Sequence, residues 1–254
     1  MVFNASDDAY DRFMGRYSMR LAPAFADFAG IHAGQHVLDC GAGTGALAAE
    51  LVRRLHADAV AVAEPSPRFV DALRHRFPGL DVQLAPAEEL PWADDAFDAA
   101  LAQLVISFVT DAPAAVGELR RVVREGGTVA IAMWDLAGGM EMLAAISRAR
   151  RAVDENPVGD ETLAHWRPEE LTSLLEGAGL HDVAVTTLEV ESAYSGYDEF
   201  WSALLGGAGP AGAWMQTLDD AGRETMRVQT HRELGAPAGA FTLSARCNAA
   251  RGIV

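Results

Sequence analysis

Three closely spaced glycines near the start of the chain are the clearest candidates for binding chemistry. They lie in the segment VLDCGAGTG at 37–45, between a short apolar run and a pattern typical of an amphipathic helix. Glycines at such a junction let a ligand approach the backbone more closely than a Cβ would permit. We therefore predict that Gly41, Ala42 and Gly43 belong to a loop that binds a nucleoside-containing cofactor.

Two acidic residues flank this loop. Glu64 ends the next apolar run, nineteen residues after Gly45, where a carboxylate can accept hydrogen bonds from both ribose hydroxyls. Asp39 lies two residues before Gly41, inside the first apolar run. A turn needed only for packing a helix on a strand explains neither acid, although Glu64 could also be a solvated carboxylate at a strand end.

The charge of Asp39 separates two classes of cofactor. Gly41, Gly43 and Ala46 satisfy the dinucleotide-binding pattern G-x-G-x-x-[GA]. A carboxylate at position 39 would repel a pyrophosphate, however, whereas it suits the ammonium and sulfonium groups of S-adenosylmethionine. All twenty basic residues are arginines, which excludes a hydride-transfer site built on a Tyr-x-x-x-Lys pair.

The amino-acid composition limits the classes of molecule that this chain is expected to bind. The 254 residues are half hydrophobic and carry a formal net charge of −16, which disfavours nucleic acid and anionic membranes as partners. The two cysteines, Cys40 and Cys247, provide neither a disulfide framework nor a metal site, and the sequence contains no H-E-x-x-H motif. We expect no metal, no signal peptide and no membrane span, and therefore a cytoplasmic protein acting on a small molecule.

A parallel sheet is needed to position the loop and the acids. Apolar runs alternate with amphipathic helical patterns through the first half of the chain, which indicates βαβ units and a doubly wound α/β sheet. Strands are predicted at 36–40, 59–63, 81–84, 97–105 and 128–134. Later strands at 181–190 and 241–249 are expected to form an antiparallel hairpin at one sheet edge. Further helices are predicted at 112–124, 138–153 and 168–177, with two more between 197 and 234.

We predict one domain, 1–254, with an N-terminal cap at 1–35 and a cofactor-binding core at 36–135. The segments 136–166 and 191–237 are assigned to a helical lid on the acceptor side. His165 and His231 lie in these lid segments and are candidates for a general base, or alternatively surface or core residues. Six aromatic residues in or beside the covering segments are candidates for contacts with a flat, apolar acceptor: Phe108, Trp134, Trp166, Phe200, Trp201 and Trp214.

Together these motifs resemble the class I S-adenosylmethionine-dependent methyltransferases, in particular the branch with the ubiquinone and menaquinone biosynthesis C-methyltransferases. The resemblance covers roughly residues 10–134 and rests on four segments: VLDCGAGTG at 37–45, EPSP at 64–67, AEELPWADDAFD at 87–98 and RRVVREGGTVAIAMWD at 120–135. It implies a Rossmann-like methyltransferase fold with S-adenosylmethionine as cofactor. It further implies in-line methyl transfer to a small molecule, mainly through alignment of the acceptor with the sulfonium methyl.

The resemblance also implies roles for individual residues on the cofactor side. Gly41 and Gly43 would pass under the methionine part, and Asp39 would lie near its amino group. Glu64, followed by Pro65, would hold the ribose. Ala87 and Glu88 would face the adenine, although this chain has Pro86 where many relatives carry an acid that bonds the adenine amine.

The resemblance also implies roles for Gln103 and for an N-terminal segment. Gln103 would lie where the chain passes the transferable methyl, or it could satisfy local backbone at a strand end. The segment YDRFMGRY at 10–17 resembles the one that folds over the cofactor, with Arg16 as a candidate partner for the cofactor carboxylate. Its aromatic residues could instead form a cap on the core.

Two other functions remain open from the sequence. An NAD(P)-dependent oxidoreductase is the first, because the glycine pattern also fits a dinucleotide. A non-catalytic protein that binds S-adenosylmethionine is the second, because a chain without activity can keep the cofactor loop.

Overall fold

Seven strands form one mixed sheet in the computed structural model, which describes residues 10–154, 163–206 and 209–254. They are β1 (Val37–Cys40), β2 (Val60–Glu64), β3 (Asp81–Leu84), β4 (Phe97–Gln103), β5 (Val123–Trp134), β6 (His181–Tyr194) and β7 (Phe241–Ile253). Their order is β3-β2-β1-β4-β5-β7-β6. The first five strands run parallel, and β7 pairs antiparallel with both β5 and β6. The predicted α/β fold with an antiparallel C-terminal hairpin is therefore confirmed.

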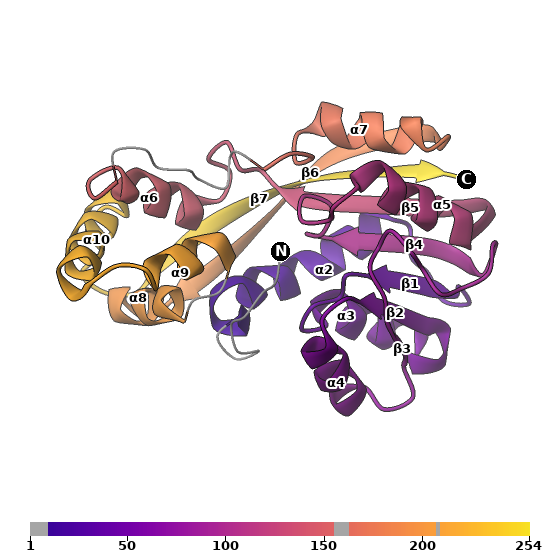
Figure 1. Cartoon of the computed structure of the whole chain (residues 1–254), viewed down its shortest axis with the longest axis horizontal. Helices are drawn as coiled ribbons and strands as arrows, with labels where there is room; N and C mark the ends of the chain where they lie inside the picture. The colour runs from indigo at the N-terminus through magenta and orange to yellow at the C-terminus, as the bar shows by residue number, and fades with distance from the viewer. Residues whose placement is uncertain (1–9, 155–162, 207–208) are drawn as a thin grey trace.

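Helices cover both faces of this sheet (Figure 1). One face carries η1 (Asp11–Gly15), α2 (Arg16–Phe28), α3 (Ala46–Leu55) and α4 (Pro67–Arg76), with the short η2 (Ala57–Ala59) between α3 and β2. The other face carries α5 (Ala112–Val122) and α7 (Pro168–Gly177). None of the helices in the described ranges has the length and apolar character needed to cross a bilayer.

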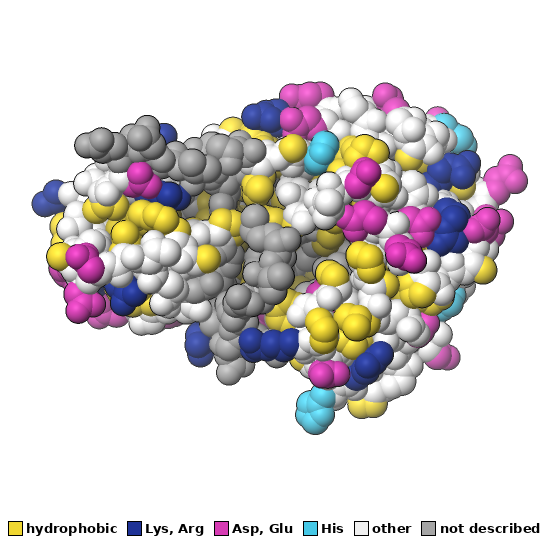
Figure 2. All heavy atoms as spheres, viewed as in Figure 1, with side chains coloured by type: hydrophobic (Ala, Val, Ile, Leu, Met, Phe, Trp, Pro, Cys, Tyr) yellow, Lys and Arg dark blue, Asp and Glu magenta, His cyan; other side chains and the backbone are white. Residues whose placement is uncertain are grey.

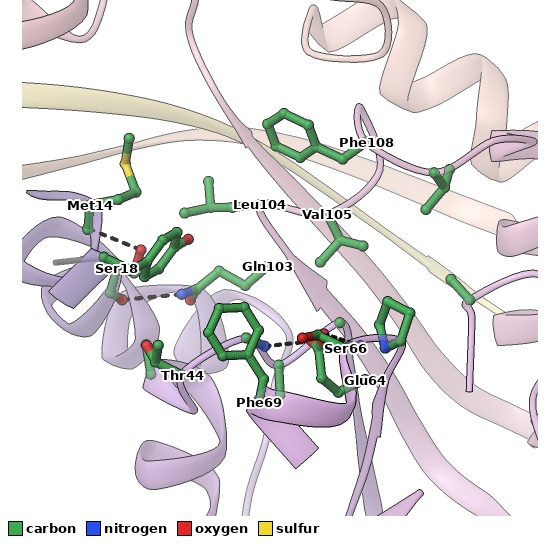
Figure 3. Close-up of a pocket in the computed structure, with 18 of the residues that line it drawn as sticks. Met14, Ser18, Thr44, Glu64, Ser66, Phe69, Gln103, Leu104, Val105 and Phe108 are labelled. Atoms are coloured by element: carbon green, nitrogen blue, oxygen red, sulfur yellow. Dashed lines mark hydrogen bonds between the residues drawn. The ribbon is translucent and has the colours of Figure 1, made fainter. Parts of the chain in front are cut away.

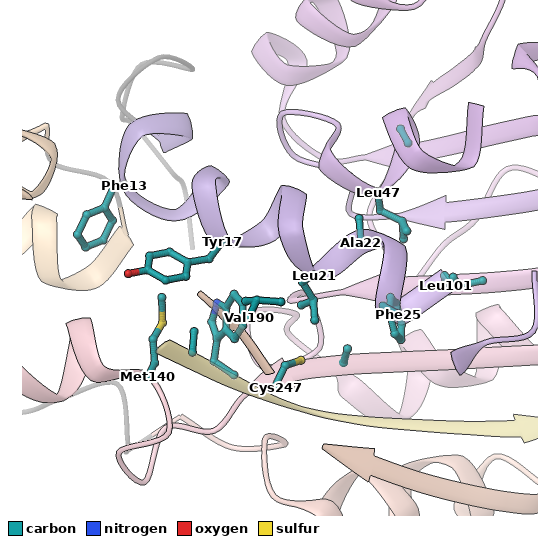
Figure 4. Packing of buried hydrophobic residues seen from close by; sticks show 14 of the residues in the cluster. Phe13, Tyr17, Leu21, Ala22, Phe25, Leu47, Leu101, Met140, Val190 and Cys247 are labelled. Carbon is teal, nitrogen blue, oxygen red and sulfur yellow. The ribbon is translucent and has the colours of Figure 1, made fainter. Parts of the chain in front are cut away.

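The two faces of the sheet bury separate groups of side chains. Val37 packs on the face of α2 and α3, and Leu38 on the face of α5. Ala99 and Ala100 of β4 divide in the same way, as expected for strands covered on both sides. The first group also takes in the N-terminal helices through four buried residues, shown in Figure 4: Phe13, Tyr17, Leu21 and Phe25. The predicted N-terminal cap is thus part of the core from residue 10 onward, while 1–9 lie outside the described residues.

A helical lobe lies at the far end of the long β6–β7 hairpin (Figure 1). It contains α6 (Glu141–Arg150), α8 (Tyr197–Leu205), α9 (Gly209–Met215) and α10 (Asp220–Glu233). These helices come from the two segments predicted as a lid, and they lie beyond the carboxyl ends of the parallel strands. Ligands of open α/β sheets bind outside that edge, so the lobe is placed to cover a site there.

Element boundaries differ from the predictions at several places, and β6 and β7 each extend four residues further than predicted. β4 ends at Gln103 rather than at 105, because Leu104 has a left-handed backbone with φ of +65°. α5 ends at Val122 and β5 begins at once, because Val123 already pairs with Phe97. The region 197–234 contains three helices instead of two.

Candidate functional site

A cavity of about 500 Å³ lies between the carboxyl ends of the parallel strands and the helical lobe. Its polar side comes from the loops after β1, β2 and β3 and from the last residue of β4. Its apolar side comes from the N-terminal helices, the segments after β4 and β5, and the lobe. Figure 3 shows this separation, with Leu104 and Phe108 across the cavity from Thr44 and Glu64. Nine of the ten predicted cofactor residues line the cavity: Asp39, Gly41, Ala42, Gly43, Glu64, Pro65, Ala87, Glu88 and Gln103.

The glycine loop needs glycine for two different reasons. Gly41 has φ of +74°, and a Cβ there would lie 2.5 Å from Cγ2 of Val105, closer than any side chain tolerates. Gly43 has φ of +56°, and a Cβ there would meet no atom within 4 Å. Because Gly43 lines the cavity, that open space belongs to the pocket. The loop is therefore shaped so that a ligand can lie directly on its backbone.

Glu64, the last residue of β2, is hydrogen-bonded to this loop. Its Oε2 accepts a hydrogen bond from the backbone N–H of Gly43 at 2.8 Å, and its Oε1 accepts one from the N–H of Ser66 at 2.9 Å. The side chain is only 5% exposed, which excludes a solvated carboxylate at a strand end. Burial raises the pKa of Glu64, and the two N–H groups offset part of that rise. Glu64 thus holds the loop in place while lining the pocket.

Asp39 is the most unusual group of the site. Its side chain is completely buried, and neither carboxylate oxygen accepts a hydrogen bond from any described residue. Burial, followed by the charge of Glu64, raises the pKa of Asp39 to about 8, and the nearby N–H of Ala48 offsets part of this. A buried carboxylate without a partner is expensive unless a cation or donor from a ligand pairs with it.

Gln103 contributes a second acceptor without a partner. Its Nε2 donates to the backbone oxygen of Ser18 at 3.1 Å, which fixes the orientation of the amide (Figure 3). Its Oε1 is buried and accepts no hydrogen bond from a described residue. The sequence left open whether this amide serves local backbone or a ligand. In the structure the amide nitrogen bonds the protein backbone, while the amide oxygen has no partner among the described residues and is available to a ligand.

The opposite rim of the pocket contains Pro65, Pro86, Ala87 and Glu88. Oε1 of Glu88 accepts hydrogen bonds from the N–H groups of Thr110 and Asp111, at 2.7 and 3.2 Å. This carboxylate therefore ties the loop after β3 to the start of α5, in addition to any contact with a ligand.

The position of Arg16 differs from its predicted role as a partner for the cofactor carboxylate. It does not line the cavity but points toward the lobe, where Nε donates to Oγ of Ser192 and Nη2 donates to Oε1 of Glu199 at 2.9 Å. Its guanidinium also lies 3.8 Å from the ring centroid of Tyr194. An acidic and aromatic surrounding on the lobe satisfies this cation, so Arg16 joins α2 to the lobe and is not placed to pair with a cofactor carboxylate.

Both histidine candidates also lie outside the pocket. Nε2 of His231 is 3.1 Å from the backbone oxygen of Pro237, and its ring lies 4.4 Å from that of Tyr197, within the lobe. The backbone oxygen of His165 accepts a hydrogen bond from Ser107, and its side chain is not part of the lining. Neither side chain is part of the cavity lining, so the structure gives no support for a general base at either position.

Of the six aromatic candidates, only Phe108 and Trp134 line the cavity. Trp166, Phe200 and Trp201 are buried in the hydrophobic core instead, and Trp214 is stacked under the guanidinium of Arg150. Large aromatic side chains of a small lobe are needed for its own packing, which is why most of them are unavailable to a ligand.

The sequence analysis missed several lining residues. Met14 and Ser18 follow Tyr10 at intervals of four, so all three share one helical face, and this spacing was a usable signal. Trp134 donates its indole N–H to Sδ of Met14 at 3.2 Å, which closes the apolar side between η1 and β5. Leu143 of α6 and Pro210 of α9 carried no comparable signal, because only the fold of the lobe brings them to the cavity.

The described residues contain no group of three His, Cys, Asp or Glu side chains arranged for a metal ion. The polar groups of the described lining are instead backbone groups, carboxylates, one amide and the side chains of five hydroxyl residues, Tyr10, Ser18, Thr44, Ser66 and Thr110. They are suited to an organic ligand with cationic and hydroxyl groups.

Comparison with known proteins gives the class of this domain. Residues 38–131 match the family model described as a methyltransferase domain. An uncharacterized methyltransferase of Mycobacterium tuberculosis (strain ATCC 25618 / H37Rv) is 37% identical over 135 residues, which are 53% of this chain and 52% of the relative. A malonyl-[acyl-carrier protein] O-methyltransferase of Halorhodospira halophila (strain DSM 244 / SL1) is 31% identical over 138 residues, 51% of this chain and 47% of the relative. The chain thus spans about half the length of the curated relatives it matches.

Solved structures share the fold over most of the chain. A putative methyltransferase from an antibiotic biosynthesis pathway of Anabaena variabilis ATCC 29413 has a TM-score of 0.61 at 16% identity, covering 91% of this chain and 96% of that one. At this identity the likeness concerns the fold alone. The α/β fold is one that this putative methyltransferase shares, and residues 38–131 match a methyltransferase domain, in agreement with the sequence-based prediction.

Proposed function

We propose that this chain transfers a methyl group from S-adenosylmethionine to a small-molecule acceptor. The observation that carries the proposal is Asp39, a completely buried carboxylate in the cavity lining with no partner among the described residues. A ligand with an ammonium and a sulfonium group supplies the missing positive charge, whereas a pyrophosphate adds a second negative one. The methyltransferase domain match at 38–131 supports the same assignment.

The residues present fit this cofactor. Asp39 would pair with the ammonium group, and the backbone of Gly41, Ala42 and Gly43 would lie along the methionine part. Glu64 is anchored by two backbone N–H groups and keeps lone pairs for the ribose hydroxyls. Pro65, with Ala87 and Glu88 at the same rim, would border the adenine.

When bound, S-adenosylmethionine supplies a methyl group on a positively charged sulfur, which is already activated for transfer. The protein's own contribution is then to hold the acceptor in line and to exclude water. The apolar side of the cavity, built by Leu104, Trp134, Leu136 and Leu143, does both. No residue of this site is assigned a proton-transfer role.

Binding experiments separate the proposal from the dinucleotide alternative. We expect S-adenosylmethionine and S-adenosylhomocysteine to bind in calorimetric titrations, and NADH and NADPH not to bind. Binding of NADH that S-adenosylhomocysteine fails to displace would overturn the proposal. A methyl-transfer assay across amines, phenols, quinone precursors and carboxylates separates catalysis from non-catalytic binding of the cofactor.

Two matched glycine variants test the position of the ligand. Gly43 and Gly79 both have positive φ, and a Cβ at either meets no atom within 4 Å, but only Gly43 lines the cavity. Gly43→Val should therefore abolish binding of S-adenosylhomocysteine, while Gly79→Val should strain the backbone to a similar extent and leave binding intact. Equal affinities in the two variants would place the ligand elsewhere.

The narrower resemblance to the ubiquinone and menaquinone C-methyltransferases stays a prediction. One relative is named an O-methyltransferase, so the acceptor atom has to come from the chemistry of this cavity.

A further inference from the structure

None of the described residues that line the cavity has a basic side chain that could pair with an anionic acceptor. The described residues that line it include three acids, Asp39, Glu64 and Glu88, and no arginine or histidine. The chain has no lysine, and the three stretches outside the described residues, 1–9, 155–162 and 207–208, contain no arginine or histidine either. A carboxylate or phosphate on the acceptor would therefore be buried among acids without a counter-charge, which is strongly unfavourable.

The side that faces the acceptor is apolar. Phe13, Trp134, Leu136 and Leu143 lie there, and the polar N–H of Trp134 is taken up by the sulfur of Met14. Figure 2 shows hydrophobic side chains along both margins of the groove between the lobe and the sheet. The bulk of the acceptor is thus hydrophobic.

No described lining residue is placed to remove a proton from the acceptor. Under the proposed function Glu64 binds the ribose and Glu88 borders the adenine, so neither carboxylate is next to the transferable methyl, and each also accepts two backbone N–H groups. The pKa of Tyr10 is raised to about 12, mainly by burial, so its phenol stays protonated. Asp39 is occupied by the cofactor cation under the proposed function. A phenol or alcohol, which must lose a proton to become a good nucleophile, is therefore disfavoured.

Among the described lining residues, Gln103 at the end of β4 has a buried side-chain amide oxygen, Oε1, that accepts no hydrogen bond. The Ser18 carbonyl holds the amide so that the oxygen, which can only accept, is the atom left over. An acceptor with an N–H would satisfy it.

We propose that the acceptor is an apolar amine whose N–H is accepted by Gln103, a proposal that rests on the proposed function. The amine reacts as its free base, having lost its extra proton to solvent before it binds. Its nitrogen lone pair forms the new N–C bond while the C–S bond of the sulfonium breaks and the electron pair of that bond stays on sulfur. The positive charge moves from sulfur to nitrogen, and a proton then leaves the nitrogen for solvent. The acidic cavity stabilises a cation before and after the step, and no base on the protein is required.

Three naphthalene compounds of nearly equal size test this. Protein saturated with S-adenosylhomocysteine is titrated calorimetrically with 2-naphthylmethylamine at pH 9.5, with 2-naphthol at pH 7.5 and with 2-naphthoate at both pH values. We expect the amine to bind at least tenfold more tightly than the other two, and labelled methyl from S-adenosylmethionine to enter the amine only. A malonyl thioester, the acceptor type named for one relative, should receive none.

A variant that adds a positive charge to the cavity tests the same point, with a matched variant outside the cavity as its control. Leu143→Arg places a cation in the apolar side and should bring the affinity for naphthoate to that for the amine or above it. Val228→Arg adds the same charge on an exposed site of α10 outside the cavity and should change neither. Failure of the amine to bind, or tighter binding of naphthol or naphthoate to the wild-type protein, overturns the amine proposal. Absence of S-adenosylhomocysteine binding in the first step would instead overturn the proposed function.

Discussion

Replacing Asp39 by asparagine should stabilise the ligand-free protein and weaken the binding of its ligand. Burial and the neighbouring Glu64 raise the pKa of Asp39 from its usual 3.8 to about 8. The folded state therefore binds more protons than the unfolded state between about pH 4 and pH 8, and its stability falls as the pH rises through that range. Each pH unit corresponds to about 1.36 kcal/mol, so full ionisation of Asp39 costs the fold on the order of 5 kcal/mol.

Asparagine has nearly the same shape and does not ionise. Asp39→Asn should therefore raise the thermal midpoint of the ligand-free protein by roughly 10–20 °C at pH 9, with little change near pH 4. The same substitution removes the partner of the ligand's cation and should weaken S-adenosylhomocysteine binding by about 1.5–3 kcal/mol, which is roughly tenfold to a hundredfold. The affinity of the wild-type protein should increase from pH 6 to pH 9, and that of the variant should not.

Thermal unfolding scans at several pH values and calorimetric titrations with S-adenosylhomocysteine measure both effects. Asp98→Asn is the matched control, because Asp98 accepts hydrogen bonds from the His36 N–H and from Arg124, which hold its pKa below the usual range against the effect of its partial burial. That variant should be less stable than the wild type at neutral pH. An Asp39→Asn variant that is destabilised and binds normally would refute the reasoning, since it would show that Asp39 has a structural partner.

Three further predictions follow from the contacts of the site. Glu64→Gln should weaken S-adenosylhomocysteine binding by about 1.5–3 kcal/mol in calorimetry without unfolding the chain; an unchanged affinity would limit Glu64 to a structural role. His165→Ala and His231→Ala should leave the pH profile of kcat/KM unaltered, because neither ring lines the cavity; loss of an inflection near neutral pH in either variant would contradict this. Arg16→Gln should lower the free energy of unfolding by about 1–2 kcal/mol, because it removes the hydrogen bonds to Ser192 and Ala193 and a solvent-screened ion pair to Glu199. Cofactor affinity should not change, and a loss of affinity in a fully stable variant would show that Arg16 belongs to the binding site.

Local patterns in the chain were enough to predict the sheet and the residues of its glycine loop that line the cavity. Alternating apolar runs and helical patterns depend on neighbours within a few residues, and so the parallel strands and the C-terminal hairpin could be predicted. The glycine loop could be predicted for the same reason, because a positive φ at Gly41 and Gly43 is a local property. Glu64 followed from its place at the end of β2, one strand away from the loop.

Local patterns could not predict which polar groups are left without a hydrogen-bond partner, or which residues form the apolar side of the cavity. Arg16 is drawn to Glu199, 183 positions away, and not to the cavity. The amide of Gln103 is oriented by the carbonyl of Ser18, 85 positions earlier, and only this contact leaves its oxygen unpaired. Such pairings depend on how the N-terminal helices and the lobe pack on the sheet, and no local pattern in the chain encodes them. Burial works in the same way, since it changes Asp39 from an ordinary acid in a strand into a buried carboxylate whose pKa is raised to about 8.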